Sequence, residues 1–186
     1  RLGLDRIDAG FGGIEKGIFV HRVLELTHRQ LLREALGQAD NLSVDQTWDI
    51  ATTSLPLSRV SSDTLTRATQ ILDEQFDILA EEQYATSQKK SRRAQRLVPH
   101  SASQHQQMQK LREDLHGLLS FEADKLLSFE PRFFELKFGM DGGESAQYAG
   151  IEFNGSIDRI DVNAKGEAVI IDYKHKSPAA LKDYAV

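Results

Sequence analysis

The sequence predicts one α/β domain in which helices come first and strands follow. Two observations predict this order. Up to about residue 130, large apolar residues recur with the 3.6-residue period of a helix, and after Pro131 they alternate or run together as in β-strands. With 186 residues, the chain is long enough for one domain with a buried core.

The first predicted helix covers residues 14–36, where apolar side chains recur at helical spacing and Gly37 can end the helix. Two later apolar stripes predict two more helices: Leu65, Ala68, Leu72, Phe76 and Leu79, then Met108, Leu111, Leu115, Leu118 and Leu119. A short helical stretch is expected at residues 45–51, with Trp48 in the core. Residues 84–104 have few large apolar side chains and are expected to be a loop or a weakly held helix end.

Three strands are expected after Pro131, at residues 133–138, 151–162 and 168–174. Gly155 interrupts the second strand, and residues 163–166 form a turn between the second and the third. Because that turn is short, the last two strands are expected to pair as an antiparallel hairpin.

The composition excludes several kinds of site. The chain has no cysteine, which excludes disulfides, thiolate zinc sites, cysteine nucleophiles and an iron–sulfur cluster within it. It contains no signal segment and no apolar run of the roughly 18 to 20 residues that cross a bilayer, so we expect a cytoplasmic protein without a membrane partner. Since the chain begins with Arg1 and ends soon after the third strand, we expect it to be a piece of a longer protein.

The charge distribution is uneven. The net charge of −5 argues against nucleic-acid binding by bulk charge, so an anionic partner needs a local basic patch. One run supplies such a patch, with no acidic residue between 87 and 96: Lys89, Lys90, Arg92, Arg93 and Arg96. These side chains could neutralise DNA phosphates and release counterions. A solvated basic loop explains the run equally well.

Acidic residues occupy strand positions that are usually apolar. Asp158 and Asp172 lie on the last two strands, 14 residues apart around one turn, so antiparallel pairing could bring the two carboxylates together. Two close carboxylates repel unless a cation lies between them, which indicates a divalent metal. Lys174 is two residues beyond Asp172 and therefore on the same face. Two aspartates and a lysine on one face are side chains suited to metal-assisted phosphodiester hydrolysis.

Three segments resemble the RecB-like branch of the PD-(D/E)XK nucleases. Residues 155–161 and 171–174 read Gly-Ser-Ile-Asp-Arg-Ile-Asp and Ile-Asp-Tyr-Lys, which is similar to the paired strand motifs of that branch. Residues 17–25 read Gly-Ile-Phe-Val-His-Arg-Val-Leu-Glu, which resembles its histidine-bearing helix. Arg1-Leu2-Gly3-Leu4 resembles the lead-in of AddB-type helicase-nuclease subunits.

The resemblance implies a fold and a division of the chain. The fold is a restriction-endonuclease-like core, a mixed central sheet flanked by helices, with a large helical insertion. The implied segments of this single domain are the histidine-bearing helix at 1–36, the insertion at 37–130 and the catalytic strands at 131–186.

The resemblance also implies roles for individual residues. Three are expected to be catalytic: Asp158, Asp172 and Lys174. Four are expected to bind the metal: His21, Asp158, Asp172 and the backbone carbonyl of Tyr173. Two glutamates are expected beside the ligands: Glu25, one turn after His21, and Glu135, at a position on the first strand where related sequences often carry glutamate.

The implied function is Mg²⁺- or Mn²⁺-dependent DNA hydrolysis. We expect the nuclease domain of a RecB/AddB-like helicase-nuclease, or an exonuclease, acting in DNA repair and recombination, with DNA and a helicase subunit or domain as partners. A stand-alone exonuclease of the CRISPR-associated type is the alternative within the same fold. A catalytically inactive DNA-binding or scaffold module that keeps the fold is the alternative of a different class.

Three polar residues near these motifs have structural interpretations. Arg159 lies on the face opposite Asp158, which favours an ion pair with Asp161. Asp161 itself is expected to cap the turn before Asn163. His28 is expected at the surface, although it shares a helical face with His21.

Overall fold

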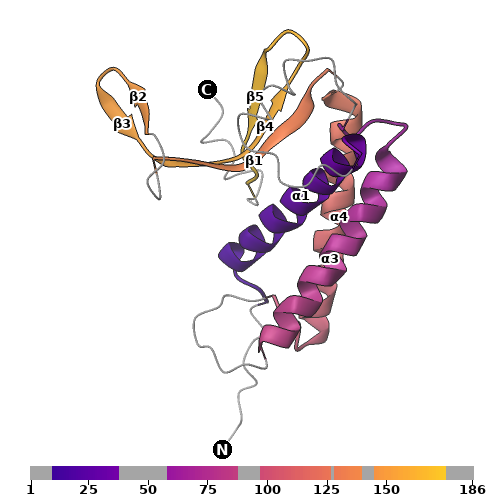
Figure 1. Cartoon of the computed structure of the whole chain (residues 1–186). Helices are drawn as coiled ribbons and strands as arrows, with labels where there is room; N and C mark the ends of the chain where they lie inside the picture. The colour runs from indigo at the N-terminus through magenta and orange to yellow at the C-terminus, as the bar shows by residue number, and fades with distance from the viewer. Residues whose placement is uncertain (1–9, 38–57, 88–96, 127, 140–144, 175–186) are drawn as a thin grey trace, which may run out of the picture.

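The computed structural model describes residues 10–37, 58–87, 97–126, 128–139 and 145–174. Within these ranges, α1 (Gly13–Ala35), α3 (Leu65–Ser87) and α4 (Ala102–Lys125) pack together, and strands β1 (Glu130–Phe138), β4 (Gly155–Val162) and β5 (Ala168–Ile171) form a sheet beside them (Figure 1). A small hairpin of β2 (Ala146–Tyr148) and β3 (Ile151–Phe153) projects from the far end of β1 and β4.

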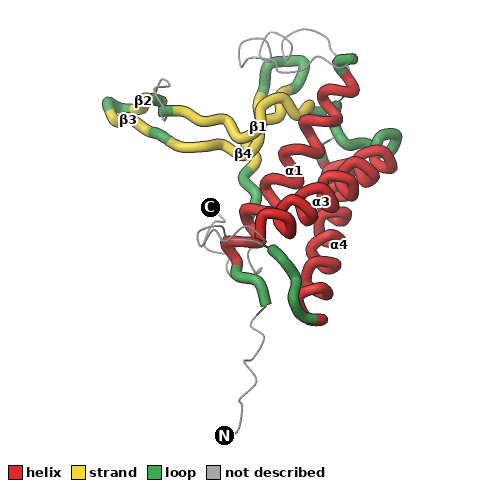
Figure 2. Tube along the Cα trace, turned by 60° about the horizontal axis from the view of Figure 1, so that its bottom comes forward, coloured by secondary structure: helices red, strands yellow, loops and turns green. Residues whose placement is uncertain are grey.

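The helices share one apolar core because each presents a stripe of large side chains at helical spacing. Phe19 of α1 meets Phe76 of α3 edge to face, with ring centroids 4.9 Å apart. Leu72 of α3 and Leu119 of α4 are fully buried in the same cluster. The core therefore holds α1 against the two later helices, as the tube view also shows (Figure 2).

The sheet has the order β1-β4-β5, and both pairings are antiparallel. Phe134 pairs with Arg159 and Leu136 with Ile157, while Arg159 also pairs with Ile171 on the other side. β4 is thus the central strand. α1 packs against β1 and β4, which brings its histidine-bearing side to the sheet.

The three long helices and the strands after Pro131 confirm the expected order of elements. Several bounds differ: β1 begins at Glu130, the second strand divides into β3 and β4, and β5 ends at Ile171 rather than at residue 174. α3 continues to Ser87 and α4 begins at Ala102, so both enter the segment expected to be a loop.

Two expectations about the architecture have different outcomes. The expected mixed sheet is not seen, because the strands of the described ranges pair only antiparallel. The assignment of residues 37–130 as an insertion stays a prediction. The stretch at 45–51, with Trp48, lies outside the described residues. In the described parts of the chain, no helix is long and apolar enough to span a membrane.

Candidate metal centre

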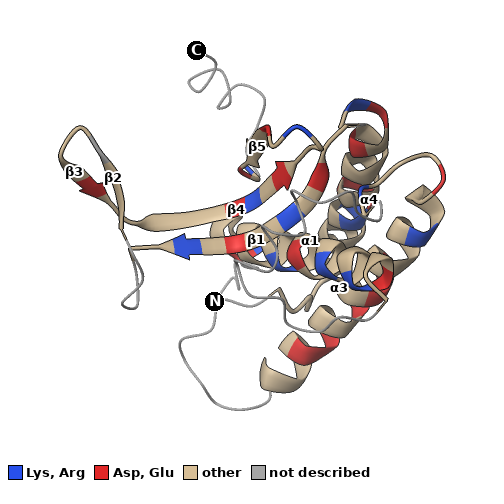
Figure 3. Cartoon of the chain, turned by 45° about the horizontal axis from the view of Figure 1, so that its top comes forward, with Lys and Arg blue, Asp and Glu red and all other residues tan. Residues whose placement is uncertain are grey.

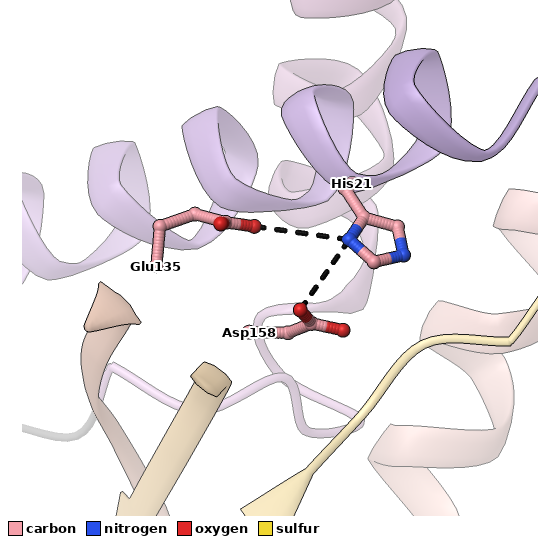
Figure 4. Close-up of side chains that lie close together, drawn as sticks. All are labelled: His21, Glu135 and Asp158. Carbon is pink, nitrogen blue, oxygen red and sulfur yellow. Dashed lines mark ion pairs between the residues drawn. The ribbon is translucent and has the colours of Figure 1, made fainter. Parts of the chain in front are cut away.

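Three side chains from three elements converge where α1 crosses the sheet (Figure 4). They are His21 of α1, Glu135 of β1 and Asp158 of β4, and one potential ligand atom of each lies within 4.8 Å of the others. His21 Nδ1 is 3.4 Å from Asp158 Oδ1 and 3.8 Å from Glu135 Oε1. All three residues are partly buried, so a cation bound there would remain accessible to water.

The strand register places the two carboxylates side by side. Phe134 pairs with Arg159 and Leu136 with Ile157, so Glu135 lies opposite Asp158. Glu135 also has a φ of 48°, in the left-handed region that costs a residue with a side chain roughly 1 kcal/mol. Like charges directly opposite each other destabilise a strand pair. The arrangement is unfavourable unless a positive charge joins the two acids.

The donor set fits a divalent cation. Carboxylate oxygens suit Mg²⁺ and Mn²⁺, and an imidazole nitrogen is a common ligand of transition metals. A cation would offset the repulsion between Glu135 and Asp158, whose carboxylates both face His21 Nδ1. We expected Glu135 beside the ligands; its position makes it a candidate ligand itself.

The main chain of Tyr173 closes one side of this centre. Its N–H donates to Asp158 Oδ2 at 2.7 Å, and its carbonyl oxygen lies 2.8 Å from His21 Nε2. The carbonyl thus meets the ring nitrogen of His21 other than the one that faces Glu135 and Asp158. Tyr173 is brought to the centre as expected, but its carbonyl is a hydrogen-bond partner of His21 in this arrangement.

The expected catalytic pair at the end of β5 lies beside the centre rather than within it. Asp172 continues the register that would set it opposite Asp158, but β5 ends at Ile171. The Asp172 carboxylate instead accepts a hydrogen bond from Lys174 Nζ at 2.7 Å, and both side chains are exposed. Among the described residues, the cluster of potential metal ligands at this centre does not include Asp172.

Glu25 supports the sheet rather than His21. Its carboxylate accepts hydrogen bonds from Arg22 and from Arg29, the latter at 2.8 Å. Arg29 in turn donates to the main-chain oxygen of Phe134 at 2.9 Å. Glu25 therefore helps to hold β1 next to α1 immediately before Glu135.

A buried ionic cluster lies on the other face of β4. Arg159 is 1% exposed and donates from Nε and Nη2 to the two oxygens of Asp161, which confirms the expected ion pair. Its Nη1 lies within hydrogen-bonding distance of Glu122, His28 and the hydroxyl of Tyr173. Acidic and basic residues follow one another along β4 (Figure 3).

This cluster corrects two expectations. His28 is 1% exposed, because the face of α1 that carries it is covered by the sheet and α4. Asp161 is fully buried and does not cap the turn; Asn163 does so, with its side-chain oxygen accepting from the N–H groups of Lys165 and Glu167. Sequence reasoning missed Glu122, since one acid within an apolar helical stripe gives no signal of its tertiary partner.

The cluster shifts the pKa values of its members. Burial raises the pKa of Glu122, but His28 and Arg159 outweigh it and leave that pKa below its ordinary value. Burial lowers the pKa of Arg159, but the Glu122 and Asp161 carboxylates outweigh burial and leave that pKa above its ordinary value, so the guanidinium stays charged. Burial raises the pKa of Tyr173, which keeps its hydroxyl protonated.

The expected DNA-binding residues Lys89, Lys90, Arg92, Arg93 and Arg96 lie outside the described residues.

The chain matches a known protein family. The family model described as the PD-(D/E)XK nuclease superfamily matches residues 2–185. Neither the curated proteins nor the solved structures contain a match.

Proposed function

Because the chain belongs to the PD-(D/E)XK nuclease superfamily, whose members are generally metal-dependent nucleases, we propose that it hydrolyses DNA with Mg²⁺ or Mn²⁺. The convergence of His21, Glu135 and Asp158 carries this proposal. These residues come from three elements far apart in the sequence, and two opposed carboxylates on neighbouring strands have no structural advantage without a cation. The fit of the donor set to a divalent metal supports the same function.

In the proposed mechanism, His21, Glu135 and Asp158 would hold the metal, with Asp172 as a further candidate ligand. When bound, a divalent metal would neutralise charge at the phosphate and lower the pKa of a water. Asp158 also accepts from the Tyr173 N–H, which fixes one of its oxygens and leaves the other facing His21. Lys174, next to Tyr173 in the chain, is the proposed group that orients the attacking water or stabilises the developing negative charge.

The more specific part of the proposal rests on the sequence motifs. The order of the histidine-bearing helix, the Asp158 strand and the Asp172-Tyr173-Lys174 segment resembles RecB-like nucleases, so we propose an exonuclease role in DNA repair and recombination. A helicase subunit or domain is the proposed partner, and the proposed location is the cytoplasm.

Hydrolysis of end-labelled linear DNA tests the function. Single- and double-stranded substrates are incubated with Mg²⁺, Mn²⁺ or EDTA, using wild type, Asp158→Asn and Lys174→Ala. Two variants on exposed residues of α4, Asp124→Asn and Lys110→Ala, are matched controls, because the ion pair described for each side chain is with a near neighbour on the same helix. We expect metal-dependent cleavage in wild type and both controls, and a loss of at least about 100-fold in the two site variants.

Metal binding separates the function from its alternative. Calorimetry with Mn²⁺ is expected to show binding by wild type and Lys174→Ala and weak binding by Asp158→Asn. A folded wild type that neither cleaves DNA nor binds Mn²⁺ would reject the nuclease proposal and favour the inactive scaffold module.

A further inference from the structure

Tyr173 connects the metal centre to the buried ionic cluster. Its main chain contacts His21 and Asp158, at 2.8 Å and 2.7 Å. Its side chain packs against the helical core, and its hydroxyl accepts a hydrogen bond from Arg159 Nη1 at 2.8 Å. One residue therefore touches both the site and a cluster that lies on the opposite face of β4.

The contact with the Tyr173 carbonyl constrains the chemistry of His21. A carbonyl oxygen only accepts hydrogen bonds, so His21 Nε2 must carry the proton in this contact. The nitrogen left for a cation is then Nδ1, which is the one that faces Glu135 and Asp158. A second hydrogen bond commonly fixes a metal-binding histidine in this way.

The position of the Tyr173 carbonyl is not set by the sheet. The ladder between β4 and β5 ends at Ile171, so this pairing does not hold the main chain at residue 173. Its N–H and carbonyl instead bond to Asp158 and His21, which are the side chains proposed to turn toward a cation. Among the hydrogen bonds described for Tyr173, the one from Arg159 to the hydroxyl uses no candidate ligand.

Arg159 is a rigid anchor for that hydroxyl. Its guanidinium is 1% exposed, and Asp161 holds it through two hydrogen bonds at 2.7 and 2.8 Å. Glu122 of α4 binds the same group at 2.9 Å. The planar guanidinium presents its donors in a fixed fork, so fixing one edge also fixes the direction of Nη1.

We propose that Tyr173 and Arg159 are positioning residues for the metal centre. Arg159 holds the Tyr173 side chain, the Tyr173 carbonyl accepts from His21 Nε2, and His21 Nδ1 is thereby aimed at the space between Glu135 and Asp158. The part of this inference that concerns metal affinity rests on the proposed function. The part that concerns the orientation of His21 holds for the metal-free protein.

Tyr173→Phe tests the anchor, because it removes the hydroxyl and keeps the ring in the core. Tyr84→Phe is the matched control, since Tyr84 is exposed on α3. The first measurement is NMR of the metal-free protein: a hydrogen-bonded Nε2–H of His21 exchanges slowly enough to give a signal, assigned by its absence in His21→Asn. We expect the signal in wild type and Tyr84→Phe, and its loss by exchange in Tyr173→Phe.

The second measurement is Mn²⁺ affinity by electron paramagnetic resonance of the free ion. We expect Tyr173→Phe to bind Mn²⁺ about tenfold more weakly than wild type, and Tyr84→Phe to bind as wild type does. Arg159→Lys keeps the charge but loses the fork, and where circular dichroism shows that it folds, it should weaken binding at least as much. If Arg159→Lys does not fold, the test of the positioning role depends on Tyr173→Phe.

The outcomes separate the two proposals. An unchanged Nε2–H signal in Tyr173→Phe, or an unchanged Mn²⁺ affinity despite the disappearance of that signal, would overturn the positioning role. A wild type that shows the Nε2–H signal but binds no Mn²⁺ would reject the metal centre of the proposed function, and the NMR comparison would still decide whether Arg159 and Tyr173 orient His21.

Discussion

Glu135 is the residue at which the candidate site most clearly lowers the stability of the fold. It has a left-handed backbone conformation, and its carboxylate faces that of Asp158 across the strand pair. Both features destabilise a strand, and neither improves packing. Residues with such costs are retained where they perform a function, which is consistent with Glu135 as a metal ligand.

Glu135→Gln should therefore separate stability from binding. In EDTA, removing one of the two opposed charges is expected to raise the free energy of unfolding by about 0.5 kcal/mol. With Mn²⁺, the loss of a ligand charge is expected to weaken binding by about 10- to 100-fold. Urea denaturation and calorimetry measure the two effects, with the exposed Glu81→Gln as the control. A less stable variant in EDTA would contradict the proposed repulsion.

Glu122 gives a pH-dependent prediction at the same scale. Its pKa in the folded protein lies below its ordinary value of 4.5, because His28 and Arg159 outweigh the effect of burial. A lowered folded-state pKa contributes stability that is complete above the unfolded pKa and is lost as the pH falls through the folded value. The free energy of unfolding of wild type is thus expected to fall below about pH 4.5.

The comparison with Glu122→Gln isolates this carboxylate from the other acids of the chain. Above pH 5 the variant should be the less stable protein. The difference should shrink as the pH falls below 4.5, where the unfolded chain binds a proton at Glu122, and toward the lower folded-state pKa. Urea denaturation from pH 3 to pH 7 measures the difference. A difference that stays constant over this range would show that Glu122 acts by packing alone.

At the scale of elements, the helices act as the support of the site. α1 carries His21, and its position over β1 and β4 depends on the apolar core it shares with α3 and α4. The hydrogen bonds from Arg29 to Glu25 and to the Phe134 carbonyl then hold β1 against α1. An error in helix packing would consequently move His21 relative to Glu135 and Asp158.

Leu72→Ala tests this support. Leu72 is fully buried on α3, so truncation should lower the free energy of unfolding by about 3 kcal/mol. Ile78→Ala on the same helix is the control; its side chain is 47% exposed, and we expect a loss below about 1 kcal/mol. Urea denaturation measures both. Equal losses would mean that α3 does not pack on α1 through Leu72.

At the scale of the whole molecule, DNA binding has to overcome an acidic chain with a net charge of −5. The basic run between residues 89 and 96 is the proposed contact, through neutralisation of backbone phosphates. Because each neutralised phosphate releases counterions, the run would steepen the dependence of affinity on salt concentration.

A variant in which Lys89, Lys90, Arg92, Arg93 and Arg96 are changed to Gln tests this DNA interaction. Binding to single- and double-stranded DNA is measured against salt concentration, with Lys174→Ala in both proteins to prevent cleavage. On duplex DNA, the slope of log K against log salt should decrease by about 0.9 for each phosphate that the variant no longer neutralises. A variant with Lys110 and Lys125 changed to Gln controls for the loss of positive charge outside the run, compared per charge removed. An unchanged slope in the five-residue variant would reject the role of the basic run in DNA binding.

Much of the fold could be predicted because its signals are local. The periodicity of Leu65 to Leu79 and of Met108 to Leu119 predicts α3 and α4, and turn residues after Val162 predict the β4–β5 hairpin. The bounds were less accurate, because β5 ends at Ile171 where the chain leaves the ladder to bond Asp158 and His21. Alternation along a sequence contains no information about such side-chain to main-chain bonds.

The sequence by itself determined the element types and the family motifs, and it marked His21 and Asp158 as candidate ligands, since these depend on residue identity and short spacing. Only the tertiary structure decided which acids meet: the register of β1 and β4 sets Glu135 against Asp158, while Asp172 pairs with Lys174. It also decided that His28, Glu122 and Asp161 are buried around Arg159. The physical reason is that a contact between distant segments depends on register and helix packing, which many residues set together.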